Sequence, residues 1–254
     1  MTMRLAGHHA LVTGAGTGIG KAIAEALGAE GASLSLVGRR ADKLAETVRD
    51  CGAANAFPAD VTNRDEVDVA FDAARAASGP ITILVNNAGA AVSKPFAQVG
   101  QDDWRAAMAV NLDALLHCCQ AAMPDLVDAE DGRIVTIASS AGVKGFAYSA
   151  PYCAAKHGAV GLMRALAAEY AKTGLTANAV CPGFTDTGMV AEAAARVSRM
   201  TGRSEDASRA ALTAFNPQGR LIAPHEVAAT VVWLCLPESR SINGQAIQIT
   251  GGET

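Results

Sequence analysis

A glycine-rich turn between a short apolar strand and a helix constrains this chain more than any other feature. Residues 9–13 read His-Ala-Leu-Val-Thr and predict a buried strand, the turn at 14–20 reads Gly-Ala-Gly-Thr-Gly-Ile-Gly, and an alanine-rich helical pattern follows as far as Glu30. Glycine permits positive φ and close backbone approach, and the first turn of a helix offers unpaired N–H groups to a pyrophosphate. The generic Gly-x-Gly-x-x-Gly spacing fails at Ile19. The position of the turn at the first strand–helix junction therefore favours dinucleotide binding over a plain structural turn.

Strand and helix patterns alternate along the rest of the chain. Short apolar runs predict further strands at 32–37, 55–59, 81–85, 133–138, 175–181 and 245–250. Amphipathic helical patterns between them are typical of an α/β fold, here a single-domain, doubly wound (Rossmann-type) parallel sheet with helices on both faces. A length of 254 residues suits one domain over 1–254. Residues 186–216 are helical in character but poor in core patterning, which predicts a mobile flap over a site or a surface helical pair.

Charge and composition narrow the possible partners. The formal net charge is -4 and the chain has no long basic run, so nucleic acid is not expected. The start lacks the long apolar core of a signal peptide, and no segment approaches the roughly 18 apolar residues that a membrane span needs, so we expect a cytoplasmic protein. The six cysteines and five histidines show no metal-ligand spacing. We therefore expect no metal site and mostly reduced, buried thiols.

Two arginines follow the second predicted strand. Arg39 and Arg40 stand at about the distance where an acidic residue would accept hydrogen bonds from the ribose of NAD. Guanidinium groups instead suit the 2′-phosphate of NADP, because arginine binds phosphate through charge-assisted hydrogen bonds. The sequence therefore favours NADP(H) and leaves NAD(H) open. The alternative role of the two side chains is to solvate the start of the helix at 42–49.

A tyrosine and a lysine four residues apart form the strongest candidate for catalysis. Tyr152 and Lys156 leave the same face of a predicted helix. An acid or base at neutral pH needs the tyrosine pKa of about 10 lowered by roughly three units, and a neighbouring ammonium can do this. The alternative is a core tyrosine beside a solvated lysine. Context favours catalysis, since the pair follows a buried strand that ends at Ser139 and Ser140, where open α/β sheets place ligands.

An asparagine interrupts a long helical pattern upstream of this pair. The pattern runs from Asp102 to about Val127, and Asn111 stands in its middle. Asparagine is a poor helix former, so its side chain needs either a function or an exposed face.

Four motifs together resemble the short-chain dehydrogenase/reductase family in its shorter, single-domain form. They cover nearly the whole chain in the family's order: the glycine turn at 13–20, Asn-Asn-Ala-Gly at 86–89, Ser139 with Tyr152-x-x-x-Lys156, and Pro-Gly-Phe-Thr-Asp-Thr at 182–187. The resemblance implies that Tyr152 is the acid in ketone reduction or the base in alcohol oxidation. It also implies that Lys156 lowers the pKa of the phenol and holds the nicotinamide ribose.

The resemblance implies roles for further side chains. Ser139 would orient the substrate carbonyl, and Asn111 would hold a water that relays protons to the lysine. Asp60 and Val61 would contact the adenine, and the glycine turn would hold the pyrophosphate. Thr187 would reach the nicotinamide carboxamide. The implied cofactor-binding set is Gly14, Thr17, Gly18, Ile19, Gly20, Arg39, Arg40, Asp60, Val61, Asn87, Ala88, Gly89, Tyr152, Lys156, Pro182, Gly183, Thr185 and Thr187.

The substrate class is suggested by two further segments. Residues 178–184 and 216–220 look most like those of the family's 3-oxoacyl-thioester and polyketide ketoreductases. Family members that dock an acyl carrier protein display basic residues where this chain has Asp125, Asp128, Glu130 and Asp131. This acidic cluster would repel an acidic carrier. The implied substrate is therefore an acyl-CoA thioester or a small ketone, and carrier docking is disfavoured.

Two other functions stay open at this point. One is an NAD-dependent 3-hydroxyacyl-CoA or secondary-alcohol dehydrogenase that works in the oxidative direction. The other is a non-catalytic dinucleotide-binding sensor or scaffold, against which the intact Ser, Tyr, Lys and Asn set argues. The family also implies a homotetramer or homodimer. Small residues on the helix that begins at Pro151 would allow close approach of another helix, from a second copy or from the same chain.

Overall fold

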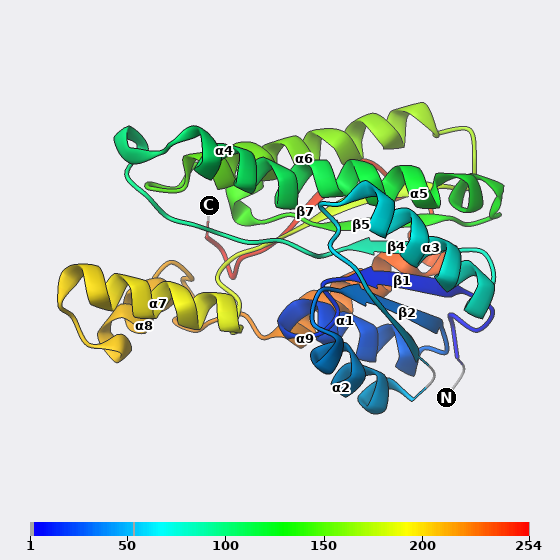
Figure 1. The fold of residues 1–254 in the computed structure, drawn as a ribbon, viewed down its shortest axis with the longest axis horizontal. Coiled ribbons are helices and arrows are strands. Elements are labelled where there is room, and N and C mark those ends of the chain that lie inside the picture. The colour runs from blue at the N-terminus through cyan, green and yellow to red at the C-terminus, as the bar shows by residue number, and fades with distance from the viewer. Residues whose placement is uncertain (1–2, 53, 254) are drawn as a thin grey trace.

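A parallel seven-stranded sheet forms the centre of the molecule (Figure 1). The computed structural model describes residues 3–52 and 54–253. The strands pair in the order β3-β2-β1-β4-β5-β6-β7, and each neighbouring pair is parallel. Their bounds are β1 (His9–Thr13), β2 (Ser33–Gly38), β3 (Ala54–Pro58), β4 (Ile83–Asn86), β5 (Arg133–Ile137), β6 (Thr176–Pro182) and β7 (Ala246–Ile249). The strand order reverses between β1 and β4, and such a switch point opens a ligand crevice at the carboxyl ends. The predicted fold class is confirmed.

Helices cover both faces of the sheet and bury two apolar layers. Successive residues of β1 alternate between the layers, with Ala10 and Val12 in one and Leu11 in the other. Strands buried on both faces read as continuous apolar runs, which is why the sequence predicted them. One layer is closed by α1 (Gly18–Ala29), α2 (Ala41–Cys51) and α9 (Pro224–Cys235). The other is closed by α3 (Arg64–Ser78), α5 (Ala114–Asp128) and α6 (Ala150–Glu169) (Figure 1).

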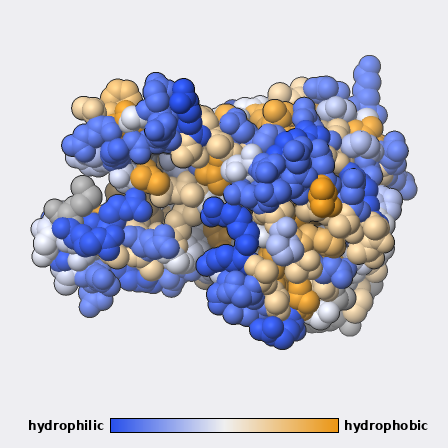
Figure 2. All heavy atoms as spheres, viewed as in Figure 1, coloured by the Kyte–Doolittle hydropathy of each residue, from blue (hydrophilic) through white to orange (hydrophobic). Residues whose placement is uncertain are grey.

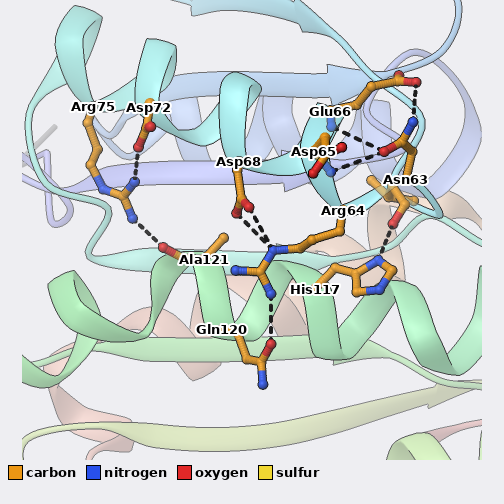
Figure 3. A network of polar contacts seen from close by, with 11 residues as sticks. Asn63, Arg64, Asp65, Glu66, Asp68, Asp72, Arg75, His117, Gln120 and Ala121 are labelled. Atoms are coloured by element: carbon orange, nitrogen blue, oxygen red, sulfur yellow. Dashed lines mark hydrogen bonds and ion pairs between the residues drawn. The ribbon is translucent and has the colours of Figure 1, made fainter.

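Polar side chains tie α3 to α5 along their exposed edge (Figure 3). Arg64 donates to the Asp68 carboxylate at 2.9 Å and to Oε1 of Gln120 at 2.7 Å. His117 of α5 lies with Nδ1 3.2 Å from the carbonyl oxygen of Val61. These contacts fix the loop after β3, which carries two of the predicted adenine contacts.

Asp125 belongs to the same helix contact and not to an open acidic surface. Arg75 Nε donates to its carboxylate at 2.6 Å, and the Ile81 N–H donates to it at 3.1 Å. Only 16% of the Asp125 side chain is exposed. Its charge is therefore balanced within the fold, and the expectation that it repels an acidic partner is wrong. Asp128, Glu130 and Asp131 are the remaining members of the predicted acidic cluster.

The predicted flap segment consists of two helices, α7 (Gly188–Thr201) and α8 (Glu205–Thr213). Figure 1 shows the pair projecting from one end of the sheet, where the helices pack chiefly on each other. Ile222 joins them to the body, because its N–H donates to the Phe184 carbonyl at 3.0 Å and its carbonyl accepts from Asp186 at 2.8 Å. Motion of this pair over the site remains a prediction.

The described residues contain no helix that is both long and apolar enough to cross a membrane. In the same part of the chain, no group of three His, Cys, Asp or Glu side chains is placed to hold a metal ion. The cysteines are free thiols, and four of them are buried: Cys118, Cys119, Cys181 and Cys235.

Candidate active site

Ser139 lies just beyond the carboxyl end of β5. Its Oγ accepts a hydrogen bond from the Ala141 N–H at 3.1 Å and so caps a short 3-10 turn, Ser140–Gly142. A Cβ on Gly142 would lie 2.8 Å from the carbonyl oxygen of Lys156. The turn therefore packs directly on α6, which carries Tyr152 and Lys156, and this contact holds Ser139 against that helix.

Lys156 is buried beside Tyr152, as the four-residue spacing predicted. Its side chain is 3% exposed, and Nζ donates to the carbonyl oxygen of Ile137 at 2.9 Å. Nζ also lies 5.7 Å from the centroid of the Tyr152 ring. The alternative of a solvated surface lysine is therefore wrong. The lysine points back under the carboxyl end of β5, toward the same edge as Ser139.

Burial shifts both pKa values in the direction of the neutral forms. It raises the pKa of Tyr152 to about 12, although a hydrogen bond with Ser139 acts in the opposite direction. It lowers the pKa of Lys156 to about 8. Loss of solvation penalises a phenolate and an ammonium alike. The expectation that Lys156 brings the pKa of the phenol below its ordinary value is thus wrong for the protein alone, in which the desolvation of the phenol dominates.

Asn111 sits in a π-helical turn that breaks the predicted continuous helix. The chain forms α4 (Gln101–Met108), then the π-turn Ala109–Asp113, then α5. Asn111 is fully buried; Nδ2 donates to the carbonyls of Ala107 at 3.0 Å and Ala90 at 2.9 Å, and Oδ1 accepts from the Ala90 N–H at 3.3 Å. The side chain satisfies the carbonyl four residues back, which the wider turn leaves open. The sequence marked Asn111 as a poor helix former, but it did not predict that the helix widens into a π-turn there.

Gly89 lies between Asn111 and Lys156. A Cβ at Gly89 would lie 2.9 Å from Oδ1 of Asn111 and 3.5 Å from Nζ of Lys156. These short distances show that the asparagine oxygen and the lysine nitrogen border the same glycine. The structure thus brings Ser139, Tyr152, Lys156 and Asn111 together at the carboxyl edge of the sheet.

The glycine loop has the geometry of a cradle for a ligand. Gly14 and Gly18 have φ values of 65° and 57°, which L side chains rarely adopt. A Cβ on Gly20 would collide with the Gly14 carbonyl and with Nδ2 of Asn87. Ile19, which breaks the generic glycine spacing, instead packs against the apolar layer under α1. Of the last two positions of the loop, Gly20 has no room for a side chain and Ile19 has, which is why the spacing differs from the generic pattern.

Thr13 and Asn87 lock the glycine loop to the turn after β4. Asn87 Nδ2 donates to the carbonyls of Thr13 at 3.0 Å and Gly14 at 3.2 Å. Thr13 Oγ1 accepts from the N–H groups of Asn87 at 3.0 Å and Ala88 at 3.1 Å. The predicted pyrophosphate and ribose segments therefore form one unit. Thr13 was not singled out from the sequence, since a threonine that ends a strand carries no distinctive pattern.

The two arginines flank the open side of this loop. Arg40 Nη2 donates to Oγ1 of Thr17 at 3.1 Å, and Arg39 Nη1 lies 4.0 Å from Oδ2 of Asp60. Arg40 immediately precedes α2, where the positive end of the helix dipole gains nothing from a cation. Solvation of the helix start thus does not explain it. Both guanidiniums lie beside residues predicted to contact the cofactor.

The segment after β6 closes the other side of the glycine loop. Pro182 ends β6, and the Gly183 N–H donates to the Ile249 carbonyl at 2.9 Å. Thr187 Oγ1 donates to the carbonyl of the buried Thr185 at 3.3 Å. A Cβ on Gly18 would lie 3.1 Å from Cγ2 of Thr187. Thr187 is thereby placed against the glycine loop, which is where a residue must lie to touch a dinucleotide held there.

Several residues near the site were missed by sequence reasoning. Lys144 Nζ lies 3.0 Å from Oε1 of the buried Glu253, so the C-terminal segment reaches the loop that carries the site. The rings of Phe146, Phe184 and Phe215 pack together with centroids 5.2 to 6.2 Å apart. These contacts join segments that are far apart along the chain, so no local sequence pattern could predict them.

Comparison with known proteins identifies the family. A family model described as short chain dehydrogenase matches residues 8–198. Nodulation protein G of Rhizobium sp. (strain N33) is 36% identical over 249 residues, which cover 98% of this chain and 97% of the relative. A putative ketoacyl reductase of Streptomyces coelicolor is 36% identical over 249 residues, which cover 96% of this chain and 95% of that protein. A variant of actinorhodin polyketide ketoreductase, solved with NADPH, has a TM-score of 0.94 at 35% identity and covers 99% of this chain and 98% of its own.

The parallel sheet, the glycine loop and the tyrosine beside a buried lysine define a nicotinamide-dependent oxidoreductase as the class of protein. With the family model and the relatives in agreement, the chain belongs to the short-chain dehydrogenase family.

Proposed function

We propose that the protein interconverts a ketone and a secondary alcohol with NADP(H). The observation that carries this proposal is the convergence of Ser139, Tyr152, Lys156 and Asn111 at the carboxyl edge of the sheet, next to the glycine loop. The relatives named as ketoacyl and polyketide ketoreductases support the same reaction.

In the proposed reduction, Ser139 and Tyr152 both donate hydrogen bonds to the carbonyl oxygen. Bound NADPH would supply the hydride to the carbonyl carbon. Negative charge then develops on the oxygen, and two positioned donors stabilise it most in the transition state. The proton of Tyr152 passes to the oxygen and completes the alcohol. A pKa of about 12 keeps this phenol protonated at neutral pH in the protein alone, which is the form that a proton donor must have.

Lys156 and Asn111 would restore the proton after each turnover. With a pKa of about 8, Lys156 carries a proton at neutral pH and gives it up more readily than an exposed lysine. The side chains of Asn111 and Lys156 both border Gly89, and three hydrogen bonds to the backbone hold Asn111 in place. We infer that Asn111 fixes a proton path to the lysine and that it does not itself titrate.

The residues around the glycine loop fit NADP(H). Thr17 precedes α1 and makes no capping bond to that helix in the described structure, which leaves the first-turn N–H groups for a phosphate. The Thr17 hydroxyl is instead contacted by Arg40, and Arg39 lies beside Asp60. Two cations next to the predicted adenosine end suit a 2′-phosphate. The NADPH in the related ketoreductase supports this choice over NAD(H).

We infer that the substrate is an acyl-CoA thioester or a small ketone. Asp128, Glu130 and Asp131 still disfavour an acidic carrier protein, although Asp125 no longer contributes. No specific observation in the described structure favours an oxidative NAD-dependent dehydrogenase or a non-catalytic sensor.

We propose a homotetramer, or at least a homodimer, that uses the outer surface of α5 and α6. Gly158 packs inside the chain, because a Cβ there would lie 2.8 Å from Cδ2 of Leu112. A Cβ on Gly161 would meet no described atom within 4 Å, and Leu116 of α5 is 46% exposed. A second copy could therefore approach at Gly161 but not at Gly158.

The test of the proposed function is oxidation of NADPH followed at 340 nm with a panel of ketones and acetoacetyl-CoA. We expect turnover with at least one ketone, and a rate with NADPH at least tenfold above that with NADH. Absence of any turnover in either direction with both cofactors would exclude the proposed reaction.

A further inference from the structure

Tyr148 occupies a backbone conformation that ordinarily requires glycine. It has φ of 64° and is the one non-glycine residue with positive φ among residues 3–52 and 54–253. The Ser149 N–H reaches back to the Phe146 carbonyl at 3.3 Å, so Tyr148 is the third residue of a four-residue turn. Positive φ at this position alone is the pattern of a type II turn, where glycine or asparagine is preferred. A tyrosine there is strained.

The strain is not compensated by burial of the ring. The Tyr148 side chain is 64% exposed, so the hydrophobic core gains little from it. The backbone is instead held in place from outside the turn, because the Lys94 N–H donates to the Tyr148 carbonyl at 2.7 Å. Lys94 is in turn fixed by a 2.6 Å contact between Nζ and Asp103 of α4. The loop after β4 and the start of α4 thus hold the tyrosine in this conformation.

Tyr148 lies on the segment that connects Ser139 to Tyr152. It stands four residues before Tyr152, and its backbone partner Lys94 follows five residues after Gly89, which borders Asn111 and Lys156. Both segments joined at this contact therefore come directly from the proposed catalytic centre. Strained residues persist where the surrounding structure enforces them, and they concentrate at ligand-binding sites.

The same region gathers aromatic rings in a chain that has few. Aromatic residues make up 4% of the sequence, yet Phe146 lies two residues from Tyr148 and packs on Phe184 and Phe215. Phe215, at the end of the flap, is 47% exposed. Figure 2 shows apolar surface in the hollow between the α4 region and the α7–α8 pair. Exposed aromatic side chains therefore occur both on the segment between Ser139 and Tyr152 and at the end of the α7–α8 segment.

We propose that Tyr148 is a specificity-determining residue that stacks on a planar apolar ring system attached to the substrate carbonyl. This inference rests on the proposed ketone reduction and narrows its substrate to aryl and other ring-bearing ketones. Aromatic stacking would be made with the part of the substrate remote from the carbonyl, while Ser139 and Tyr152 contact the oxygen. Tyr148 takes no part in the chemical step.

Three variants separate the ring from the backbone. Tyr148→Phe keeps the ring, Tyr148→Ala removes the ring and keeps the strained φ, and Tyr148→Gly removes both. The kinetic comparison uses 2-acetylnaphthalene and the small aliphatic ketone ethyl acetoacetate with NADPH. We expect the KM for 2-acetylnaphthalene to rise about tenfold in the Ala and Gly variants and less than twofold in the Phe variant, because stacking is lost only in the first two. The KM for ethyl acetoacetate and kcat should change less than twofold in all three.

A purely structural role would give a different result. If Tyr148 only shaped the turn, Tyr148→Ala, which keeps the strained φ, and Tyr148→Gly, which relieves it, would both be as active on 2-acetylnaphthalene as the wild type; this pattern would overturn the proposal. Equal loss on both ketones, or no loss on either, would also overturn it. Thermal unfolding checks that both variants fold. The thermal midpoint of Tyr148→Gly should be at or above that of Tyr148→Ala, because glycine tolerates the positive φ.

Binding measured without turnover keeps this inference distinct from the proposed reaction. Calorimetric titration of 2-acetylnaphthalene into protein mixed with NADP+, which cannot reduce it, should show about tenfold weaker binding for Tyr148→Gly than for the wild type. If NADPH oxidation fails with both ketones but this difference is present, the reaction is wrong and ring binding stands. If turnover occurs and the titration shows no difference, the role of Tyr148 is wrong and the reaction stands.

Discussion

Burial in the fold moves the pKa values of Tyr152 and Lys156 in opposite directions, each toward the uncharged form. The pKa of the phenol is about 12 and that of the lysine is about 8, each moved by burial. A protonated phenol is the form required for reduction of a ketone. The lysine remains mostly cationic at pH 7, in a buried position where it donates a hydrogen bond to the Ile137 carbonyl. The site therefore keeps an unfavourable buried charge next to its proton donor.

We expect Tyr152→Phe to reduce kcat by about 10²- to 10⁴-fold, because it removes the proton donor and leaves the ring in place. NADPH affinity, measured by quenching of protein fluorescence or by calorimetry, should change less than threefold. Ser140→Ala is a matched control in the neighbouring turn, since we propose that Ser139, and not Ser140, contacts the carbonyl. Turnover above one tenth of the wild-type rate in Tyr152→Phe would show that another group donates the proton.

Replacement of the buried lysine should stabilise the protein while it abolishes activity. The pKa of Lys156 falls from 10.5 to about 8 on folding. Below pH 8 the lysine is charged in both states and burial of that charge destabilises the folded state; the penalty is relieved as the pH rises from 8 to 10.5, because the unfolded chain then holds more protons. We expect Lys156→Met to increase the free energy of unfolding at pH 7 by about 1–2 kcal/mol, after the loss of the hydrogen bond to Ile137.

Urea unfolding at pH 7 and pH 10 measures this difference. The advantage of Lys156→Met over the wild type should shrink at pH 10, because the wild-type penalty is smaller there. The exposed Lys172 gives a control, and Lys172→Met should change the free energy of unfolding by less than about 0.5 kcal/mol. A destabilised Lys156→Met at pH 7 would mean that the ammonium has stronger compensating partners than the Ile137 carbonyl.

At the scale of elements, the π-turn between α4 and α5 depends on one side chain. Asn111 satisfies both backbone groups of Ala90 and the carbonyl of Ala107. Asn111→Ala would leave these buried groups unpaired, so we expect a loss of about 2–3 kcal/mol and a fall in thermal midpoint of roughly 5–10 °C. Calorimetry checks this, with the exposed Arg105→Ala in α4 as the control. An unchanged midpoint would show that water replaces the amide.

We propose that the two arginines at the junction of β2 and α2 set the choice of dinucleotide. We expect Arg39→Ser together with Arg40→Ser to raise the KM for NADPH by about 10- to 100-fold, which corresponds to the net loss of about one charge-assisted hydrogen bond to a phosphate, roughly 1.5–3 kcal/mol. The KM for NADH should change less than twofold. Arg49→Ser is the control. It removes a positive charge from the last turn of α2, but Arg49 makes no contact with the glycine loop in the described structure, so the KM for NADPH should not change. Equal effects on both cofactors would show that the two arginines do not recognise the 2′-phosphate.

At the scale of the whole molecule, the sheet was predictable and several site details were not. Strands buried on both faces leave continuous apolar runs, so the strands and the doubly wound, parallel class of the sheet could be inferred from alternation, whereas the strand order came from the structure. The sequence marked Asn111 as a poor helix former but did not predict the π-turn there. The pKa of Tyr152 depends on how much solvent the fold removes, and the charge of Asp125 is balanced by Arg75 from a distant helix. Both effects arise from tertiary contacts that residue spacing does not encode.

The attachment of the α7–α8 pair to the rest of the molecule predicts that the pair opens more easily than the sheet and its covering helices. The two helices pack chiefly on each other, and the Ile222 backbone pairs link them to the body. Segments with few buried contacts open at low free energy, and closure over a bound ligand removes that freedom. We expect amides of α7 and α8 to exchange with solvent at least tenfold faster than those of α9 in the free protein. Addition of NADP+ with a bound ketone should slow their exchange several-fold and leave α9 unchanged, as hydrogen–deuterium exchange mass spectrometry can resolve. Equal protection of α7, α8 and α9 in the free protein would show that the pair is a fixed part of the body and not a flap.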